Sequence, residues 1–326
     1  MPASTASLAL DVISARLADF EPEWQRFLQR IPPPTPFQTP EWLLTWWSCF
    51  GSGEPHVLVF RHDAGIAGVM PCFLHPWNGR RQLTLIGAGI SDCLDPVFDP
   101  AHVSGIVDAL GCHLSQTPGW DICDWQDLSA ETPLQALGAG SPDTPCSEIV
   151  LNTPFEAFLQ SRPAELKRNL RQCKNRSRAF GGLEFEAVSR PAADLLAALI
   201  DLHGARWREA GQSGTIAANG SAEFLLDVCP KLAGRDMLRL FVLRLGGRIA
   251  AMLLALRNQS TLFSYLPAFD PAYKKYGFGH VLHEHALRYA HENGYRAWNF
   301  LRGEEPYKFN WGAQPIPKRR LVLRRS

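Results

Sequence analysis

Several signatures that would fix a compartment or a protein class are missing from this sequence of 326 residues. Its eight cysteines include no CxxC pair, which argues against a zinc ribbon or a disulfide framework and favours reduced thiols. No stretch approaches the ~18 consecutive apolar residues that cross a bilayer. The N-terminus lacks the basic start of a signal peptide. We therefore expect a cytoplasmic protein without a transmembrane segment.

Common catalytic signatures are also missing. The sequence has no GxSxG elbow, no GK[ST] ending of a P-loop and no HExxH zinc motif. The histidine-rich segment HVLHEHA (280–286) places His280 and His283 on one helical face, but two ligands do not make a zinc site. We therefore expect no metal and no covalent nucleophile.

Lysine is missing from the first 150 residues, and this reveals an uneven charge distribution. Residues 1–150 hold 6 Lys and Arg against 17 Asp and Glu, whereas residues 151–326 hold 27 against 15. The net charges of −11 and +12 predict two domains, an acidic one over 1–150 and a basic one over 151–326. The basic half would face an anionic ligand, or the two halves would attract each other.

The hydrophobic pattern predicts a mixed α/β protein. In the first half, helical segments at 21–30 and 39–50 alternate with strand-like runs. The second half predicts three consecutive strands, a glycine-containing turn, a helix, and further strands, with a hairpin at Gly246-Gly247. The strand-like runs and the helix are 237–247, 248–259, 260–270, 279–293 and 295–301.

The segment YKKYGFGHVLHEHA (273–286) has two lysines and two glycines in front of the expected helix. Such a turn exposes backbone N–H groups at the positive end of the helix dipole, and this arrangement suits a phosphate. By spacing alone, the pattern is more typical of a tight turn that starts a helix and binds nothing.

Lys274-x-x-Gly277-x-Gly279, between a strand and a helix, resembles the pyrophosphate loop of the GNAT acyltransferases, which holds the diphosphate of acyl-coenzyme A. Residues from about 160 to 312 resemble, more narrowly, the CelD-like acetyltransferases associated with cellulose biosynthesis. The segments that carry this resemblance are LKRNLRQCKNRSRAFG, LHGARW, YLPAFDPAYKKYGFG and HENGYRAWNFLRGEEPYKFNWG, with PFQTPEWLLTWWSCFG in the first half. The FemAB aminoacyl transferases are more distantly similar. The resemblance implies two tandem GNAT-like lobes, each a mixed, mostly antiparallel sheet flanked by helices.

The chain departs from this family at two places. Gly277-Phe278 stands where the family often has Ser-Pro, a change that keeps the phosphate loop. Asn299 stands where an aspartate is frequent. Because Asn299 carries no charge, we assign it no acid–base role.

The resemblance implies roles for the residues of the loop and of the turn after strand 295–301. Acetyl-CoA or another acyl-CoA would bind with its diphosphate on the loop and its pantetheine arm between splayed strands, one of which offers a free N–H to the thioester. Tyr307 would protonate the leaving thiolate, and Glu304 or Glu305 would act as the base, with Asp270 as an alternative that is explained more simply as an Asp-Pro turn. The loop residues are Lys274, Lys275, Gly277, Phe278 and Gly279.

Acceptor-binding residues are expected around the same turn. Arg302 and Lys308 flank it and could hold an anionic acceptor such as a sugar nucleotide, while Tyr265 would line the acyl pocket or pack in the core. His203, Arg206 and Trp207 lie on one helix and would form an acceptor wall, or Trp207 would anchor that helix to the core.

The segment 162–178 predicts a basic amphipathic helix, with Leu166 and Leu170 on its apolar stripe. It could bind the 3′-phosphate of coenzyme A, an anionic membrane or tRNA, or remain a solvated face.

Taken together, the residues and the resemblance lead us to expect an acyl-CoA-dependent N- or O-acyltransferase. It would transfer the acyl group directly onto an amine or hydroxyl, with a saccharide of polysaccharide biosynthesis as one candidate acceptor. A FemAB-like transferase that uses aminoacyl-tRNA and a non-catalytic binding protein are the alternatives.

Overall fold

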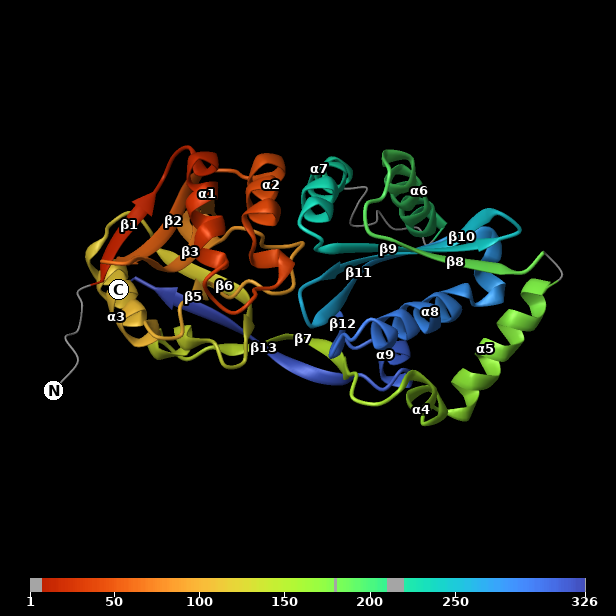
Figure 1. Cartoon of the computed structure of the whole chain (residues 1–326). Helices are drawn as coiled ribbons and strands as arrows, with labels where there is room; N and C mark the ends of the chain where they lie inside the picture. The colour runs from red at the N-terminus through yellow and green to blue at the C-terminus, as the bar shows by residue number, and fades with distance from the viewer. Residues whose placement is uncertain (1–7, 179–180, 210–219, 326) are drawn as a thin grey trace. The chain divides into compact units, whose positions relative to one another are not determined.

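The computed structural model describes residues 8–178, 181–209 and 220–325. The chain divides into two compact units (Figure 1). We call Met1–Thr144 with Pro317–Ser326 the first lobe and Pro145–Ile316 the second lobe. The last ten residues thus return to the first lobe, which differs from the expected division into 1–150 and 151–326.

The first lobe is a mixed sheet with helices on both faces (Figure 1). Its strands follow the order β1-β2-β3-β4-β6-β13, and the short β5 pairs with β3. All these pairings are antiparallel except that of β4 with β6. The elements are β1 (Ala9–Ile13), α1 (Leu17–Leu28), η1 (Pro36–Gln38), α2 (Pro40–Phe50), β2 (Glu54–His62), β3 (Gly65–Trp77), β4 (Arg80–Leu85), β5 (Val97–Phe98), α3 (Val103–Gln116), β6 (Ile122–Ser129), η2 (Pro133–Leu137) and β13 (Gln314–Arg324).

The second lobe has a sheet in the order β7-β12-β11-β10-β9-β8. Among the described pairings in this order, only that of β11 with β12 is parallel. Within this lobe, α6 and α7 lie on one face of the sheet and α8 and α9 on the other (Figure 1). The elements are β7 (Ser141–Val150), α4 (Phe155–Gln160), α5 (Ala164–Ser177), β8 (Leu183–Val188), α6 (Ala193–Glu209), α7 (Ser221–Gly234), β9 (Leu238–Leu245), β10 (Arg248–Arg257), β11 (Thr261–Phe269), η4 (Pro271–Tyr276), α8 (Phe278–Glu292), β12 (Ala297–Arg302) and α9 (Pro306–Asn310).

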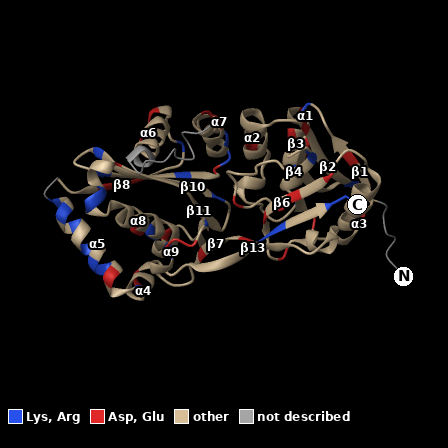
Figure 2. Cartoon of the chain, turned by 180° about the vertical axis from the view of Figure 1, so that it is seen from behind, with Lys and Arg blue, Asp and Glu red and all other residues tan. Residues whose placement is uncertain are grey.

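The expected fold class is therefore confirmed: both sheets are mixed and mostly antiparallel, with helices on both faces. The order of strands, turn and helix expected for the second half is also present. The charge contrast is weaker between the lobes than between the sequence halves, because the C-terminal segment 317–326 carries five basic residues into the first lobe. Net charges are −5 for the first lobe and +6 for the second. Lys and Arg of the second lobe gather on α5 (Figure 2).

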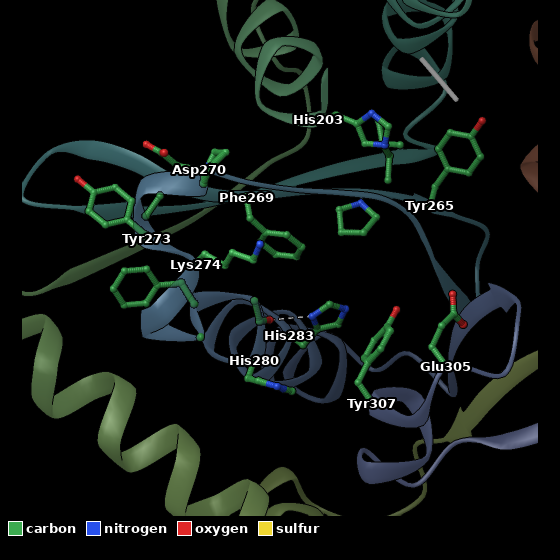
Figure 3. A pocket seen from close by; sticks show the side chains of 17 residues that line it. His203, Tyr265, Phe269, Asp270, Tyr273, Lys274, His280, His283, Glu305 and Tyr307 are labelled. Atoms are coloured by element: carbon green, nitrogen blue, oxygen red, sulfur yellow. Dashed lines mark hydrogen bonds between the residues drawn. The ribbon is translucent and has the colours of Figure 1, made fainter. Parts of the chain in front are cut away.

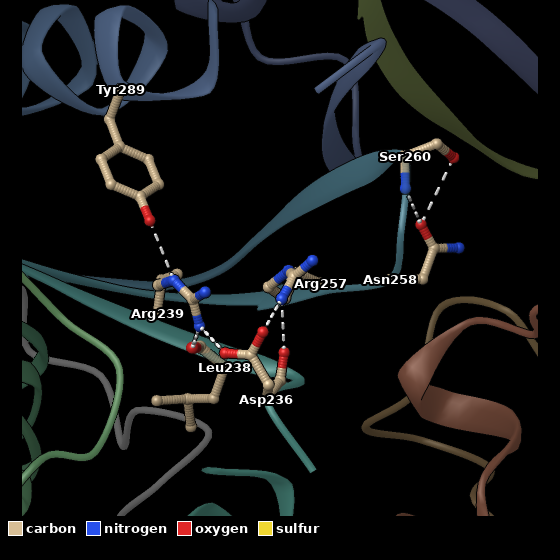
Figure 4. Close-up of polar contacts among 7 residues, drawn as sticks. All are labelled: Asp236, Leu238, Arg239, Arg257, Asn258, Ser260 and Tyr289. Carbon is tan, nitrogen blue, oxygen red and sulfur yellow. Dashed lines mark hydrogen bonds and ion pairs between the residues drawn. The ribbon is translucent and has the colours of Figure 1, made fainter. Parts of the chain in front are cut away.

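Local chemistry explains the turns of the second sheet. Gly246 and Gly247 have φ of 55° and 77°, as the turn between β9 and β10 requires. At the next turn, the Asn258 side-chain oxygen accepts hydrogen bonds from the N–H groups of Ser260 and Thr261 at 3.1 and 2.9 Å. Figure 4 shows this turn near Asp236, whose carboxylate pairs with Arg239 and Arg257 and so ties the start of β9 to the end of β10.

The second lobe's core is built largely on α8, which packs against β9, β10 and β11. Its apolar stripe is fully buried, as the helical period of the sequence predicts. The stripe consists of Val281, Leu282, Ala286, Leu287 and Ala290. This packing fixes the N-terminus of α8 at the end of β11, where the glycine-containing loop lies.

Candidate active site

A cavity of about 720 Å³ opens within the second lobe, beside the glycine-containing loop. Its walls come from α6, β11, η4, the first turns of α8, and the segment that starts α9 (Figure 3). Its lining combines the charged side chains of Asp270, Lys274 and Glu305 with aromatic and apolar ones (Figure 3). Such a lining suits a ligand with a long neutral arm and one charged end.

The cavity exists because β11 and β12 separate. They pair only over Thr261–Phe263 and Ala297–Asn299, after which β11 runs on to Phe269. Leu254 faces Leu266 and Ala255 faces Ser264, so that Tyr265 is the extra residue of a β-bulge, and its side chain lines the cavity.

On the other side of the gap, β12 leaves its ladder at Leu301, which has φ of 62°. The buried Asn299 stabilises this irregularity: its side-chain oxygen accepts the Leu301 N–H at 2.7 Å, and its amide donates to Glu148 Oε2 at 3.0 Å. An aspartate could not donate to a second carboxylate. These two hydrogen bonds explain why an asparagine stands at position 299, and its side chain does not line the cavity.

The glycines of the loop have specific structural tasks. Gly277 has φ of 72° and links η4 to α8, while a Cβ on Gly279 would lie 2.9 Å from the Phe269 ring. Asp270 accepts the Ala272 N–H at 2.9 Å and so starts η4. These tasks account for the turn by themselves. They also leave the first N–H groups of α8 at the cavity wall, where an α-helix supplies no acceptor of its own.

The two loop lysines lie differently. Lys274 lines the cavity and extends into it (Figure 3). Lys275 does not line it, and its ammonium lies 5.2 Å from the centre of the Tyr276 ring. Lys274 is thus the loop cation that can meet an anion bound at the start of α8.

Tyr307, on α9, lines the far end of the cavity and points into it (Figure 3). Its ring packs against Phe300 and His283, with centroid separations of 5.8 and 5.6 Å. Glu305 also lines the cavity, half exposed, with Oε2 2.9 Å from Lys308 Nζ, whereas Glu304 is exposed and lies outside it. Of the two glutamates expected near the chemistry, the structure brings Glu305 to the cavity.

Lys308 is placed differently from the expectation. Its side chain is 2% exposed, and its ammonium donates to the carbonyls of Leu301, Arg302 and Gly303 at 3.3, 2.7 and 3.1 Å. This position argues against contact with an acceptor, because the donors are already used. Arg302 is half-buried and does not line the cavity, and the side chains of Arg206 and Trp207 lie outside the described residues.

The sequence interpretation missed His280 and His283 as cavity residues, because it considered 280–286 only as a metal motif, whereas it placed His203 in an acceptor wall. His203, His280 and His283 all line the cavity. His283 is buried, and its Nδ1–H donates to the Gly279 carbonyl at 2.8 Å. Burial lowers the pKa of His283 to about 4. The hydrogen bond to Gly279 acts in the opposite direction, and the nearby charges of His280 and Lys308 lower the pKa further. Neutral His283 therefore bonds back to the first turn of α8. Within the described ranges, no group of three or more His, Cys, Asp or Glu could hold a metal ion.

Comparison with known proteins now adds the family. Residues 164–309 match the family model described as "Acetyltransferase (GNAT) domain". The second lobe carries a GNAT-type domain. This match covers the loop, the splayed strands and Tyr307, and it assigns the lobe an acyltransferase fold. No curated protein matches the chain.

Solved structures extend the likeness to both lobes. A crystal structure of FemX matches 96% of this chain and 97% of its own, with a TM-score of 0.68 and 11% identity. The C-terminal domain of a putative lysylphosphatidylglycerol synthetase from Agrobacterium fabrum matches 95% of this chain and 93% of its own, with a TM-score of 0.61 and 13% identity. A tandem GNAT protein from the clavulanic acid biosynthesis pathway matches 97% of this chain and 98% of its own, with a TM-score of 0.51 and 11% identity. At these identities the likeness concerns the fold: two tandem GNAT-like lobes.

Proposed function

We propose that the second lobe binds an acyl-CoA and transfers its acyl group directly to an amine or hydroxyl. The observation that carries this proposal is the position of the cavity. It runs from the N-terminus of α8, with Lys274, past the gap between β11 and β12 to Tyr307. A diphosphate at the first end would leave the thioester near the second.

The reaction needs no covalent intermediate on the protein. The acceptor nitrogen or oxygen forms a bond to the thioester carbon, the carbon–sulfur bond breaks, and the acceptor loses a proton. Glu305, directly or through water, is the candidate that takes this proton, and Tyr307 is the candidate that gives one to the departing thiolate. A backbone N–H of β11 next to the Tyr265 bulge would stabilise the negative charge on the carbonyl oxygen.

Calorimetric titration with acetyl-CoA and longer acyl-CoAs tests the donor. Lys274→Ala should weaken binding about tenfold, because it removes a charge-assisted contact to the diphosphate. Lys275→Ala is the matched control, since that neighbouring ammonium lies outside the cavity. If no acyl-CoA binds the folded wild type, or if both variants behave alike, the loop does not hold a diphosphate.

Tyr307→Phe separates binding from chemistry. We expect the affinity for acyl-CoA to stay within about threefold of the wild type, while release of the free thiol falls by about 100-fold, as for loss of a general acid. A hydroxyl-free variant with full thiol release would remove Tyr307 from the mechanism.

Transfer from aminoacyl-tRNA is the second candidate, as in the FemAB group that the sequence resembles. The fold likeness to FemX and the exposed cations of α5, among them Arg168 and Arg176, favour it. It predicts RNA binding that weakens steeply with salt. Acyl-CoA binding with no measurable RNA binding at low salt would exclude it.

The acceptor class remains a further proposal: a saccharide or sugar nucleotide of polysaccharide biosynthesis, as the CelD-like resemblance implies. A non-catalytic role in polysaccharide assembly would leave the cellular phenotype of Tyr307→Phe and Glu305→Gln equal to that of the wild type. None of the described helices is long and apolar enough to cross a bilayer.

A further inference from the structure

A second cavity, of about 540 Å³, lies in the second lobe among α4, α5 and α8. It shares no lining residue with the first cavity. Its walls combine apolar groups of Leu159 and Leu170 with the cationic side chains Lys167, Arg171 and Lys174, which follow one another at successive turns of α5. These three basic residues therefore face a cavity, whereas Arg168 and Arg176 lie outside it.

Two of the three cations have partners. Lys167 Nζ donates to the Gln160 carbonyl at 2.6 Å, and Lys174 Nζ lies 2.7 Å from Glu284 Oε1. Arg171 forms no hydrogen bond or ion pair with any residue in the described part of the chain. A guanidinium can hold a carboxylate or phosphate through two parallel hydrogen bonds, so Arg171 offers an anion site.

Glu284, on α8, provides the opposite charge. Its side chain is 5% exposed, and it lines the cavity. One oxygen accepts from Lys174, but the other, Oε2, is buried and has no hydrogen-bond partner among the described residues. A buried carboxylate oxygen without a donor is unfavourable. A ligand with an ammonium or similar donor would satisfy this oxygen.

From this pairing of an unpartnered guanidinium with an unpartnered buried carboxylate oxygen, we infer that the second cavity binds a small zwitterion. The ligand has a primary ammonium that contacts Glu284 and, a few bonds away, a carboxylate or phosphate that contacts Arg171. An anion alone would leave Glu284 Oε2 unsatisfied, and an amine alone would leave Arg171 unpaired. The site is independent of the proposed acyl-CoA cavity.

Four simple probes separate these requirements by calorimetry. β-Alanine and phosphoethanolamine carry both groups on the same two-carbon spacer and distinguish carboxylate from phosphate. Ethanolamine and inorganic phosphate carry one group each. We expect saturable 1:1 binding of at least one zwitterion, and binding of each single-charge probe weaker by about tenfold, because each loses one charge-assisted contact.

Two variants assign the site. Arg171→Gln and Glu284→Gln should each weaken the zwitterion about tenfold. Arg168→Gln should leave the affinity for the zwitterion unchanged, because the Arg168 guanidinium lies outside the cavity. It lies 3.9 Å from the exposed carboxylate of Glu165. Arg171→Gln leaves no protein group unpaired and keeps the test valid if Glu284→Gln fails to fold. The inference is overturned if neither zwitterion binds, if a single-charge probe binds as tightly, or if Arg171→Gln binds like the wild type.

Discussion

The two lobes have the same strand order but differ at the segment that forms the site. β1-β2-β3-β4-β6-β13 corresponds to β8-β9-β10-β11-β12-β7, with the single parallel pair in the same place. α3 corresponds to α8, and each precedes the second strand of that parallel pair. In the second lobe β11 is continuous. In the first lobe its counterpart is split into β4 and β5 by residues 86–96.

A short sequence repeat marks the equivalent positions. Phe98-Asp99-Pro100-Ala101 and Phe269-Asp270-Pro271-Ala272 both end the strand that precedes the helix. Each aspartate accepts the N–H of the alanine two residues on, at 3.0 and 2.9 Å. α3 then begins four residues after Asp99, but α8 begins eight residues after Asp270. The second lobe has therefore gained the room for Lys274 and for the left-handed Gly277.

Removing this difference should have the largest effect on donor binding. Deletion of residues 274–277 would give the second lobe the loop length of the first and remove Lys274 with the left-handed turn. We expect acyl-CoA affinity to fall by at least about 100-fold, about 2.7 kcal/mol. Calorimetry measures the loss, and unchanged far-UV circular dichroism checks the fold. Retained affinity in a folded deletion variant would place the donor elsewhere.

Each lobe also contains a buried lysine at the equivalent irregular strand. Lys308 Nζ donates to the carbonyl of Leu301, and Lys318 Nζ donates to the carbonyl of Asp127 at 3.4 Å. Leu301 and Asp127 are both left-handed, with φ of 62° and 57°. Because the lysine recurs in the lobe without the glycine loop, the comparison favours a structural role for Lys308.

Lys308→Met tests this role. Loss of a buried ammonium leaves three carbonyls without their donor, and we expect the free energy of unfolding to fall by about 3 kcal/mol. Denaturant unfolding measures it, with Lys318→Met as the matched variant of the first lobe. Acyl-CoA affinity of the folded protein should stay unchanged in both. A selective loss of affinity in Lys308→Met, without loss of stability, would contradict the structural role.

The sequence predicted the parts of the second lobe that depend on local chemistry. The Gly246-Gly247 turn, the order of strands and the start of α8 follow from glycine geometry and hydrophobic period. The FDPA repeat is also visible in the sequence and aligns the lobes, but only its second copy is interpreted above, as an Asp-Pro turn or an alternative base at Asp270.

The remainder depends on contacts between residues far apart in the sequence. Lys308 is a surface cation by pattern, and it becomes a buried one only because β12 turns its carbonyls inward at Leu301. Likewise, the basic composition of the closing strand suggested the second lobe, but Lys318 pairs with Ser129 of β6. Neither the register nor the bulge is encoded in a local pattern.

His283 offers a pH-dependent test. Its pKa of about 4 lies below the value of about 6.5 for an unfolded histidine, so the unfolded chain binds a proton first as the pH falls. The stabilisation that neutral His283 contributes to the free energy of unfolding is fully present above pH ~6.5. It is lost as the pH falls toward ~4, by an expected total of about 3 kcal/mol.

Denaturant unfolding between pH 7 and 4, compared with His283→Asn, isolates this contribution from other titrating groups. The matched first-lobe variant is His56→Asn, since burial also lowers the pKa of the half-buried His56 to about 4. We expect His283→Asn to reduce the pH dependence of the unfolding free energy more than His56→Asn does, because the His283 imidazole is buried. Parallel pH curves for the wild type and His283→Asn would show that His283 is not held neutral.

The smallest effect concerns the repeated aspartates, and it bears on the chemistry. Asp99→Ala and Asp270→Ala each remove one side-chain hydrogen bond that starts a helical turn, and each should cost about 1 kcal/mol of unfolding free energy. Similar losses would support equivalent roles. Asp270→Ala should also keep thiol release from acyl-CoA within about threefold of the wild type. The equivalent aspartate caps a turn in the first lobe too, so its presence is explained without a role as a catalytic base in the second lobe. A decrease comparable to that of Tyr307→Phe would instead assign Asp270 to proton transfer and break the correspondence between the lobes at this position.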